Sequence, residues 1–241
     1  MFFPDRINLL PGDRVLEVGP GATPHPRSQI FLEKRFALNE AFRQRGGLPA
    51  VEFTKPVIYY DGGKFPFRDH EFDYVICSHV LEHVENPEAF LGELWRVATR
   101  GYLEFPTIHY DYLYNFKEHV NLLLHKEGEI LWMPKHQTAL NDFDAIQEFL
   151  RATLESGYHE LVQAMKDDFF QGFEWIAPIP ARKVENLIEL VPSRGTLTHR
   201  SDRYPPPTGQ ELAKELVRRV GRRISAAITC IAQKNQSRGR A

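Results

Sequence analysis

A pair of glycines directly after a short apolar segment is the first feature of this chain that could do chemistry. Residues 14–18 predict a buried strand, and Gly19-Pro-Gly21 follows it, with Glu17 inside its last residues. Glycine allows a sharp turn and lets backbone amides approach a ligand closely. Open α/β sheets bind ligands at the carboxyl ends of their strands. Glu17, Gly19 and Gly21 therefore predict a cofactor-binding turn, and the alternative is a turn that only ends a strand.

Acidic residues follow the next two predicted strands, which we expect over residues 28–32 and 56–60. Glu33 follows the first, where a carboxylate can accept hydrogen bonds from both hydroxyls of a ribose. Asp61 follows the second and could accept from an adenine amino group. Either acid alone could be a solvated loop side chain, but acids at successive strand ends favour a nucleoside-binding edge.

A longer motif continues from Asp61-Gly-Gly-Lys-Phe-Pro-Phe67 into the apolar run 72–78 and the tripeptide Leu81-Glu-His83. Together with the glycine turn, these motifs resemble the class I S-adenosylmethionine-dependent methyltransferases, in particular the group called type 11. The resemblance covers residues 13–107, because Gly101-Tyr-Leu-Glu-Phe-Pro106 also matches the family's fifth strand.

The resemblance implies S-adenosyl-L-methionine as the cofactor and assigns contacts to it. Glu17, Gly19 and Gly21 would surround the methionine part, and Glu33 would bind the ribose. Asp61 and Gly62 would border the adenine, while Ser78 and His79 would lie beneath the sulfonium. Two departures stand out: Phe65 replaces the usual leucine, and a short link with three prolines over residues 19–27 replaces the usual first helix.

The chemistry that the resemblance implies needs little machinery beyond alignment. A sulfonium methyl group is already electrophilic, so orientation of the acceptor can supply much of the rate. An acceptor hydroxyl also needs a base, and histidine is the commonest choice. His79, directly after the fourth strand, is best placed, and His83 and His119 complete the predicted catalytic set. His83 could instead be a structural histidine, and His109 and His125 are further candidates. Because these histidines lack a recognised ligand spacing, we expect no metal.

The pattern of elements up to Pro106 alternates between strands and helices, with a clear helix start at Asn86-Pro87-Glu88. It predicts an α/β fold, a Rossmann-like mostly parallel seven-stranded sheet with helices on both faces. We also expect a helix over 36–45. After Pro106 we expect an inserted hairpin and helical lid. Its elements are a hairpin turn at 126–128 and helices at 139–154 and 158–166. The last strands of the main sheet are expected at 173–176 and 184–191, the second of which could equally be a helix.

Three parts of the chain follow from this pattern. We expect a cofactor-binding core at residues 1–106, a substrate-recognition insertion or lid at 107–170, and sheet completion with a basic C-terminal tail at 171–241. The tail carries arginines at 218, 219, 222 and 223. They could contact phosphates or form a solvated face.

Composition narrows the function classes. The 241 residues are 42% hydrophobic and 26% charged, as in ordinary globular proteins, and the net charge of -2 argues against a nucleic-acid binder. The two cysteines, Cys77 and Cys230, imply no disulfide framework, which favours a cytoplasmic protein. No segment approaches the roughly 18 apolar residues that span a bilayer.

The function predicted from sequence is methyl transfer to a small-molecule or glycan acceptor, most simply a hydroxyl. Two alternatives stay open. A non-catalytic member of the fold would bind S-adenosylmethionine without turnover. An NAD-dependent oxidoreductase would also place an acid after its second strand, but it prefers a third glycine where this chain has Pro24.

Overall fold

A six-stranded sheet, in the order β3-β2-β1-β4-β5-β8, forms the centre of the computed structural model. The structure describes residues 1–36, 55–155 and 159–192. All strands of the sheet run parallel except β8, which is antiparallel to β5. The strands are β1 (Val15–Val18), β2 (Ile30–Lys34), β3 (Val57–Tyr60), β4 (Tyr74–Ser78), β5 (Gly101–Pro106) and β8 (Phe170–Trp175). The predicted α/β fold with a mostly parallel sheet is confirmed.

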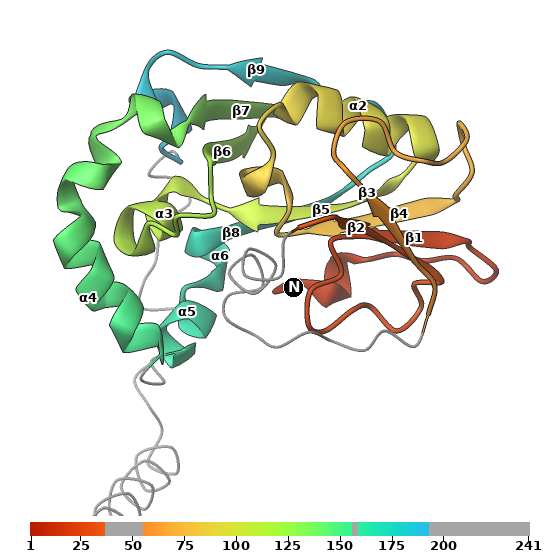
Figure 1. Ribbon diagram of the computed structural model, residues 1–241, viewed down its shortest axis with the longest axis horizontal. Helices are drawn as coiled ribbons and strands as arrows, with labels where there is room; N and C mark the ends of the chain where they lie inside the picture. The colour runs from red at the N-terminus through yellow and green to blue at the C-terminus, as the bar shows by residue number, and fades with distance from the viewer. Residues whose placement is uncertain (37–54, 156–158, 193–241) are drawn as a thin grey trace, which may run out of the picture. The chain divides into compact units, whose positions relative to one another are not determined.

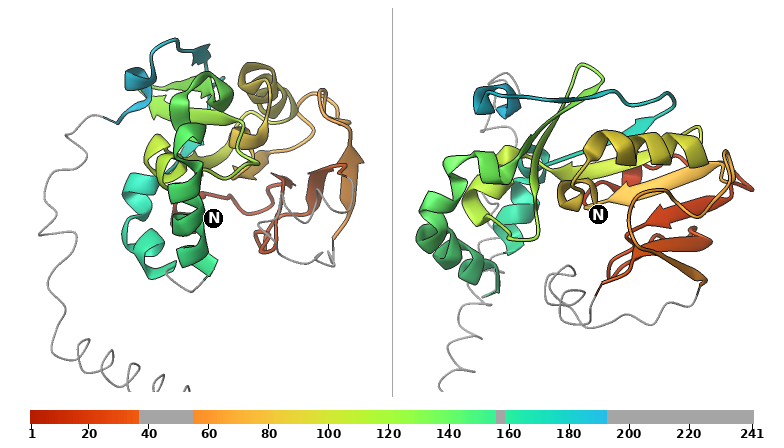
Figure 2. Two further views of the ribbon diagram at one scale, coloured as in Figure 1. Left: turned by 60° about the vertical axis from the view of Figure 1, so that its left-hand side comes forward. Right: turned by 45° about the horizontal axis from the view of Figure 1, so that its top comes forward.

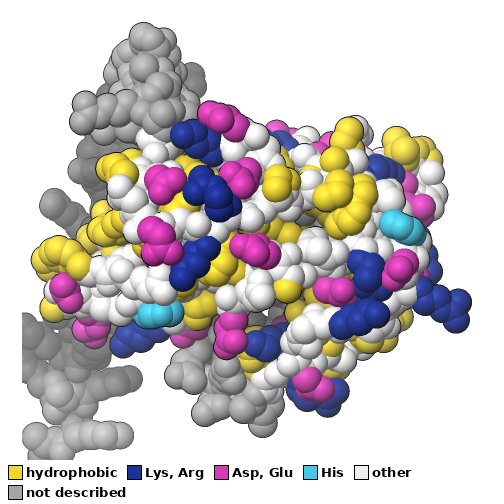
Figure 3. Space-filling view, turned by 90° about the horizontal axis from the view of Figure 1, so that it is seen from above, with side chains coloured by type: hydrophobic (Ala, Val, Ile, Leu, Met, Phe, Trp, Pro, Cys, Tyr) yellow, Lys and Arg dark blue, Asp and Glu magenta, His cyan; other side chains and the backbone are white. Residues whose placement is uncertain are grey.

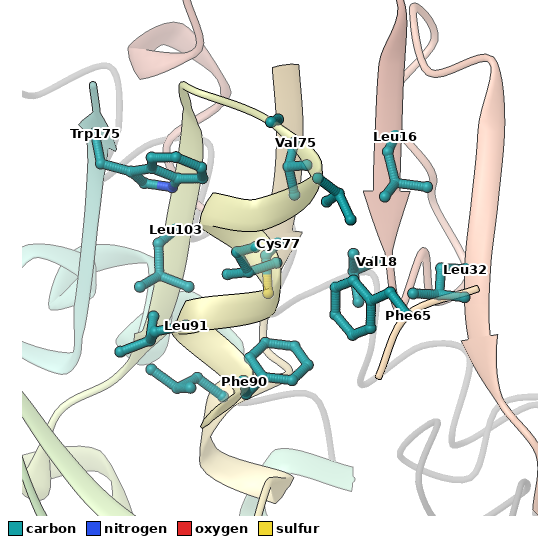
Figure 4. Packing of buried hydrophobic residues seen from close by; sticks show 14 of the residues in the cluster. Leu16, Val18, Leu32, Phe65, Val75, Cys77, Phe90, Leu91, Leu103 and Trp175 are labelled. Atoms are coloured by element: carbon teal, nitrogen blue, oxygen red, sulfur yellow. The ribbon is translucent and has the colours of Figure 1, made fainter. Parts of the chain in front are cut away.

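Successive side chains of each strand point to opposite faces of the sheet, so the core has two layers, one on each face. Leu16, Val75 and Leu103 pack with helix α2 (Pro87–Val97) on one face. Figure 4 shows these side chains meeting Phe90 and Leu91 of α2. Their strand neighbours, which include Tyr74, face the opposite layer. Figure 1 shows α2 lying over one face, and the other face is covered by the N-terminal segment and by side chains of later helices.

The helix start predicted at Asn86 is confirmed. The Asn86 side chain accepts a hydrogen bond from the amide of Ala89 at 3.0 Å, Pro87 occupies the first helical position, and Glu88 lies in the first turn. The asparagine satisfies one of the amides that a helix N-terminus leaves free, and the fixed φ of proline suits the first turn.

A second, three-stranded sheet follows the first. Strands β6 (Asn121–Lys126) and β7 (Glu129–Pro134) form the predicted hairpin, whose turn residues Glu127 and Gly128 both have positive φ. Strand β9 (Ala181–Lys183) joins β7 in parallel. Figures 1 and 2 show this sheet beside α2.

Four helices lie beyond the carboxyl end of β5 (Figures 1 and 2). They are α3 (Ile108–Tyr114), α4 (Asp144–Glu155), α5 (His159–Ala164) and α6 (Lys166–Phe169). Single 3-10 turns occur at η1 (Pro4–Arg6), η2 (Leu81–His83), η3 (Lys135–Gln137), η4 (Ala139–Phe143) and η5 (Leu187–Leu190). Residues 107–170 thus contain the expected hairpin and helices, and the division into three parts stays a prediction.

Two strand predictions need correction. The main sheet has six strands among the described residues rather than seven, because 184–191 contains the 3-10 turn η5 at Leu187–Leu190, which is closer to the helical alternative than to a strand. Strand β2 begins at Ile30 rather than at Ser28. Ser28 is buried in the preceding turn, where its hydroxyl donates to Glu17 at 2.6 Å, so it is used for a side-chain contact rather than for strand pairing.

The predicted lack of an ordinary first crossover helix is borne out by residues 19–29, all of which the structure describes and none of which is helical. The expected helix at 36–45 lies outside the described residues except for Phe36, and the basic tail also lies outside them. Among the described helices, none combines the length and apolarity that crossing a membrane requires.

Arg96 fastens the Phe65–Asp69 segment to α2. Its guanidinium donates to the carbonyl oxygens of Phe65 and Phe67 at 3.0 and 2.8 Å, and to the carboxylates of Glu93 and Asp69. Glu93 also accepts from the amide of Phe65 at 2.7 Å. This branched set of contacts needs the planar, multi-donor guanidinium.

We expect Arg96→Lys to lower the free energy of unfolding by about 2 kcal/mol, because a lysine cannot replace several charge-assisted hydrogen bonds at once. Urea unfolding at pH 7 measures the change. The control is Arg182→Lys, whose side chain is 50% exposed in ion pairs with Glu129 and Glu189, and it should shift stability by less than about 0.5 kcal/mol. Equal shifts in the two variants would contradict the role given to Arg96.

Candidate active site

The register of the parallel strands places four predicted or observed site residues at one level of the sheet edge. Val18 pairs with Leu32 on one side and with Cys77 on the other, so Gly19 is level with Glu33 and with Ser78. Ser78 in turn pairs with Glu104 of β5. The carboxyl edge of the sheet therefore brings together residues that are up to 85 positions apart in the chain (104 − 19 = 85).

The glycine turn has the conformation that its sequence requires. Gly19 and Gly21 have φ of +62° and +56°, which residues other than glycine rarely adopt. A Cβ at Gly19 would lie 2.5 Å from a methyl group of Val80, so this position is closed by the loop after β4. A Cβ at Gly21 would meet no described heavy atom within 4 Å. Open space thus borders a left-handed backbone at the place predicted for a ligand.

Glu17 holds the turn rather than pointing free from it. Its buried carboxylate accepts from the Ser28 hydroxyl at 2.6 Å and from the His25 amide at 2.9 Å. Burial raises the pKa of Glu17, and these hydrogen bonds offset only part of the rise. The side chain predicted to surround the cofactor braces the loop that would carry it.

Glu33 and Asp61 occupy neighbouring strand ends, as predicted. Glu33 lies within β2 and pairs with Tyr59 of β3, two residues before Asp61. Asp61 is exposed and forms an ion pair with Arg35 at 3.2 Å. Gly62 follows with φ of +94°, and the nearest described atom to its added Cβ is Cε of Lys34, at 3.9 Å. A second open glycine turn therefore stands at the same sheet edge.

Glu104 is the most heavily bonded side chain at this edge, and sequence reasoning did not single it out. Its buried carboxylate accepts from the Ser78 hydroxyl at 2.8 Å, the Tyr102 hydroxyl at 2.5 Å, and the amides of Phe2 and Phe3 at 2.9–3.1 Å. Burial alone would raise the pKa of Glu104, but His79 and these donors lower it to about 2. The available signal was an acid inside an otherwise apolar strand.

His79 lies between two buried carboxylates. Its Nε2 is 3.0 Å from Glu104 and its Nδ1 is 3.3 Å from Glu82, and its backbone is left-handed with φ of +57°. Burial would lower the pKa of His79, but the contacts with Glu104 and Glu82 raise it to about 9. Both ring nitrogens already face acids, so this geometry does not suit the predicted role of a general base at neutral pH.

Aromatic rings surround the outer side of His79. Phe2 and Phe170 stack with 3.8 Å between ring centroids, and each meets His79 edge-on, at 5.6 and 5.2 Å. Tyr110 adds a further ring 4.8 Å from Phe170. Tyr110 belongs to α3, while Phe2 comes from the N-terminus of the chain.

His83 and His119 lie next to each other in the structure. His83 belongs to η2, the 3-10 turn that follows His79 in the chain. Their ring centroids are 4.9 Å apart. Nδ1 of His83 is 2.9 Å from the carbonyl oxygen of Glu118, and Nδ1 of His119 is 2.6 Å from the buried carboxylate of Asp111. Sequence reasoning identified both histidines but not Asp111, whose role depends on the turn between α3 and β6.

The remaining histidine candidates lie elsewhere. His109 contacts the carbonyl oxygen of Asp168 at 3.4 Å, and His125 stacks on Phe173 with centroids 3.7 Å apart. Neither belongs to the cluster around Glu82, Glu104 and Asp111.

Comparisons with known proteins point to methyltransferases. Residues 37–103 match a family model described as a methyltransferase domain. An uncharacterised methyltransferase of Bacillus velezensis is 22% identical over 168 residues, which are 69% of this chain and 66% of that protein. A demethylmenaquinone methyltransferase of Renibacterium salmoninarum is 31% identical over 102 residues, 40% of this chain and 41% of that protein. The chain thus spans less than two thirds of the length of these curated relatives.

Similar solved structures include an S-adenosylmethionine-dependent methyltransferase of Thermotoga maritima, described as a possible histamine N-methyltransferase. It is 26% identical over 42% of this chain and 46% of that chain, with a TM-score of 0.30.

Glu104→Gln should destabilise the protein at pH 7 by about 3 kcal/mol, because it leaves His79 with one carboxylate fewer and places an amide NH2 group, which is a donor, opposite existing donors. The pKa of Glu104 is lower in the folded state, about 2 against 4.5. Its stabilisation is therefore present above pH 4.5 and is lost as the pH falls from 4.5 toward 2.

Urea unfolding at pH 7, 4.5 and 3 measures both effects. The wild-type protein should lose stability over this range more steeply than Glu104→Gln. Glu174→Gln is the control, since Glu174 is exposed on β8 and accepts from Tyr74. If the stability of Glu104→Gln falls with pH as steeply as that of the wild type, the pH dependence does not come from the Glu104 carboxylate.

Proposed function

We propose that this chain, whose motif order and matched family model are those of the class I S-adenosylmethionine-dependent methyltransferases, transfers the methyl group of S-adenosylmethionine to an acceptor hydroxyl. The resemblance expected from residues 13–107 is confirmed by the methyltransferase family model over residues 37–103. The observation that carries the proposal is the open, left-handed turn at Gly21, at the same sheet edge as Glu33 and Asp61.

The residues at this edge fit the cofactor. The turn at Gly19 and Gly21 lets the backbone approach a bound cofactor closely. Glu33 is level with Gly19, where its carboxylate would accept hydrogen bonds from the hydroxyls of a ribose. Asp61 and Gly62 follow the end of β3, beside the place proposed for an adenine. On the other side of the glycine turn, Ser78 is the last residue of β4 and His79 follows it. We propose these residues as the binding site for S-adenosylmethionine.

The link after the turn favours S-adenosylmethionine over NAD. Dinucleotide-binding folds place a pyrophosphate at the N-terminus of the helix that follows the first strand, where free amides and the helix dipole favour negative charge. Residues 19–29 are all described and contain no helix. The turn therefore lacks the positive helix end that a pyrophosphate needs, whereas the methionine part of S-adenosylmethionine carries no phosphate.

A cavity of about 380 Å³ next to His119 is the proposed acceptor pocket. Its walls carry mostly polar side chains, which suit a polyhydroxylated small molecule or a glycan better than an apolar one. They are Asn115, Lys117, His119, Val120, Lys135, His136, Asn141 and Asp144. On the face seen in Figure 3, Lys and Arg side chains are interspersed with Asp and Glu, an arrangement that offers no extended basic surface for a nucleic acid on that face.

The chain's own residues would align the acceptor and handle its proton. S-adenosylmethionine, when bound, supplies an electrophilic methyl group, so in-line orientation supplies much of the rate. His79 is fixed between Glu82 and Glu104, and we propose that it positions the acceptor beside the cofactor rather than removing a proton. His119, oriented by Asp111 and bordering the cavity, is the better-placed proposed group for the hydroxyl, with His83 at its side.

Gly21→Val should weaken the binding of S-adenosylhomocysteine by at least about tenfold, because the side chain would fill the open space beside the turn. The matched control is Gly128→Val. Gly128 also has positive φ and no described atom within 4 Å of its added Cβ, but it lies in the β6–β7 turn. Both variants thus place a β-branched side chain on a left-handed backbone with open space beside it. Isothermal titration measures the affinity, with NAD as the competing ligand.

Equal binding by wild type and Gly21→Val would remove the glycine turn from the site. Tighter binding of NAD than of S-adenosylhomocysteine by the wild-type chain would favour the oxidoreductase alternative.

His79→Gln should retain affinity for S-adenosylhomocysteine and lower kcat at least about tenfold, because glutamine can donate to only one side of the Glu82–Glu104 pair and misplaces the acceptor. Release of S-adenosylhomocysteine in the presence of polyhydroxylated acceptors measures turnover. His125→Ala, in the second sheet, should leave kcat unchanged. Cofactor binding by the wild type without turnover on any hydroxyl acceptor would favour the non-catalytic alternative.

A further inference from the structure

We propose that Glu82, His83 and His119 form a binding site for a divalent transition-metal ion, with zinc as the first expectation. One potential ligand atom from each residue lies within 4.8 Å of the other two. The three side chains come from the 3-10 turn η2 and from the segment before β6, which are 36 residues apart at their nearest (119 − 83 = 36). This separation is why no motif in the sequence predicts a metal.

The hydrogen bonds of both histidines leave one nitrogen of each ring for a ligand bond. Nδ1 of His83 lies 2.9 Å from the Glu118 carbonyl oxygen, which can only accept, so Nδ1 carries the proton. Nδ1 of His119 likewise donates to Asp111 at 2.6 Å. A neutral ring protonated on Nδ1 has its lone pair on Nε2. Histidine ligands of metals are typically held in this way by a carbonyl or a carboxylate.

Glu82 supplies a buried anionic ligand whose ion-pair partner, His79, is shared with a second acid. Its side chain is fully buried, and neither carboxylate oxygen has a well-aligned hydrogen-bond donor among the described residues. His79 lies 3.3 Å from Oε1 as an ion-pair partner, but it also lies 3.0 Å from Glu104. Buried carboxylates are costly unless cations and donors compensate them. An ion between Glu82 and the two histidines would add to the compensation that His79 divides between two carboxylates.

The cluster is held in place by contacts of the backbone around it. The amide of Val120 donates to the carbonyl oxygen of Glu82 at 2.8 Å, and the Asn121 side chain donates to Val84. Zinc bonds of about 2.1 Å place neighbouring ligand atoms roughly 3.4 Å apart, so the side chains would draw in by about 1 Å on binding. His119 also borders the cavity of about 380 Å³, so one of the three residues lies at the wall of a hollow.

The donor set selects the class of metal. Two imidazole nitrogens and one carboxylate suit zinc, cobalt and iron, whereas magnesium and calcium prefer oxygen ligands alone. Three protein ligands leave a position open for a substrate or water, as in catalytic zinc sites. Given the proposed function, such an ion would lower the pKa of an acceptor hydroxyl beside the cavity. In the metal-bound form it would replace His119 in activating the hydroxyl, because Nε2 of His119 would then be a metal ligand.

The test is a titration of the full chain, purified without a polyhistidine tag and freed of metal with a chelator, with Co²⁺ and Zn²⁺ and without any cofactor. We expect one equivalent of Co²⁺ to give visible d–d absorption and Zn²⁺ to displace it, while excess Mg²⁺ does not. Zinc should also raise the thermal unfolding temperature. If the wild-type chain binds neither ion at one equivalent, the proposal is wrong.

Variants locate the site. His83→Ala, His119→Ala and Glu82→Gln should each lose the one-equivalent binding, and His136→Ala should keep it, since His136 borders the same cavity outside the cluster. Asp111→Asn keeps its shape and should weaken binding about 10–100-fold through His119. Circular dichroism checks folding, and the isosteric Glu82→Gln and Asp111→Asn decide the case if an alanine variant fails to fold. Undiminished binding in these two variants would overturn the assignment.

The outcome is separable from that of the proposed function. Metal binding is measured without cofactor, and S-adenosylhomocysteine binding is measured with the chelated protein. A chain that binds zinc but not S-adenosylhomocysteine would retain the metal site and lose the methyltransferase proposal. The opposite result would retain the methyltransferase proposal and remove the metal site.

Discussion

The burial of two carboxylates, Glu82 and Glu104, at the carboxyl edge of the sheet is the constraint on which this site depends. Buried charges are costly unless they are paired and hydrogen-bonded. Glu104 satisfies this requirement with donors from β4, β5 and the N-terminal segment, and His79 takes a left-handed backbone to lie between the two acids. The N-terminal segment is therefore fixed over the sheet by the same carboxylate that fixes His79.

A third buried carboxylate, Glu17, takes the place of the missing crossover helix. In an ordinary parallel crossover a helix packs the link between two strands against the sheet. Here Glu17 performs this function for residues 19–29, because it accepts from Ser28 and from the His25 amide. Lys55 adds hydrogen bonds to the carbonyl oxygens of Pro26 and Ser28. The turn is thus held from inside by polar contacts.

Local patterns predicted the parts of the structure that depend on neighbouring residues. The glycine turn, strand β4, the Asn86 cap and the β6–β7 hairpin all follow from such patterns. The pattern could not decide between strand and helix for 184–191, where distant contacts matter: residues 187–190 form the 3-10 turn η5, and the seventh strand is absent from the described part of the main sheet. The candidate site divides in the same way. His79, His83 and His119 stood out by type and position, but their partners Glu104 and Asp111 are set by strand register and by a turn, which one sequence does not reveal.

The loop from His79 to Val84 joins the parts of the site. Val80 closes the space above Gly19, His79 meets Glu104, and the carbonyl oxygen of Glu82 accepts from Val120 ahead of β6. His83 meets the Glu118 carbonyl oxygen in that same segment. The proposed acceptor cavity is lined by residues of 115–120, the segment that Glu82 and His83 contact, and Val80 of the same loop contacts the space above Gly19. The proposed cofactor turn, the buried acids and the proposed acceptor cavity are therefore linked through one loop of six residues.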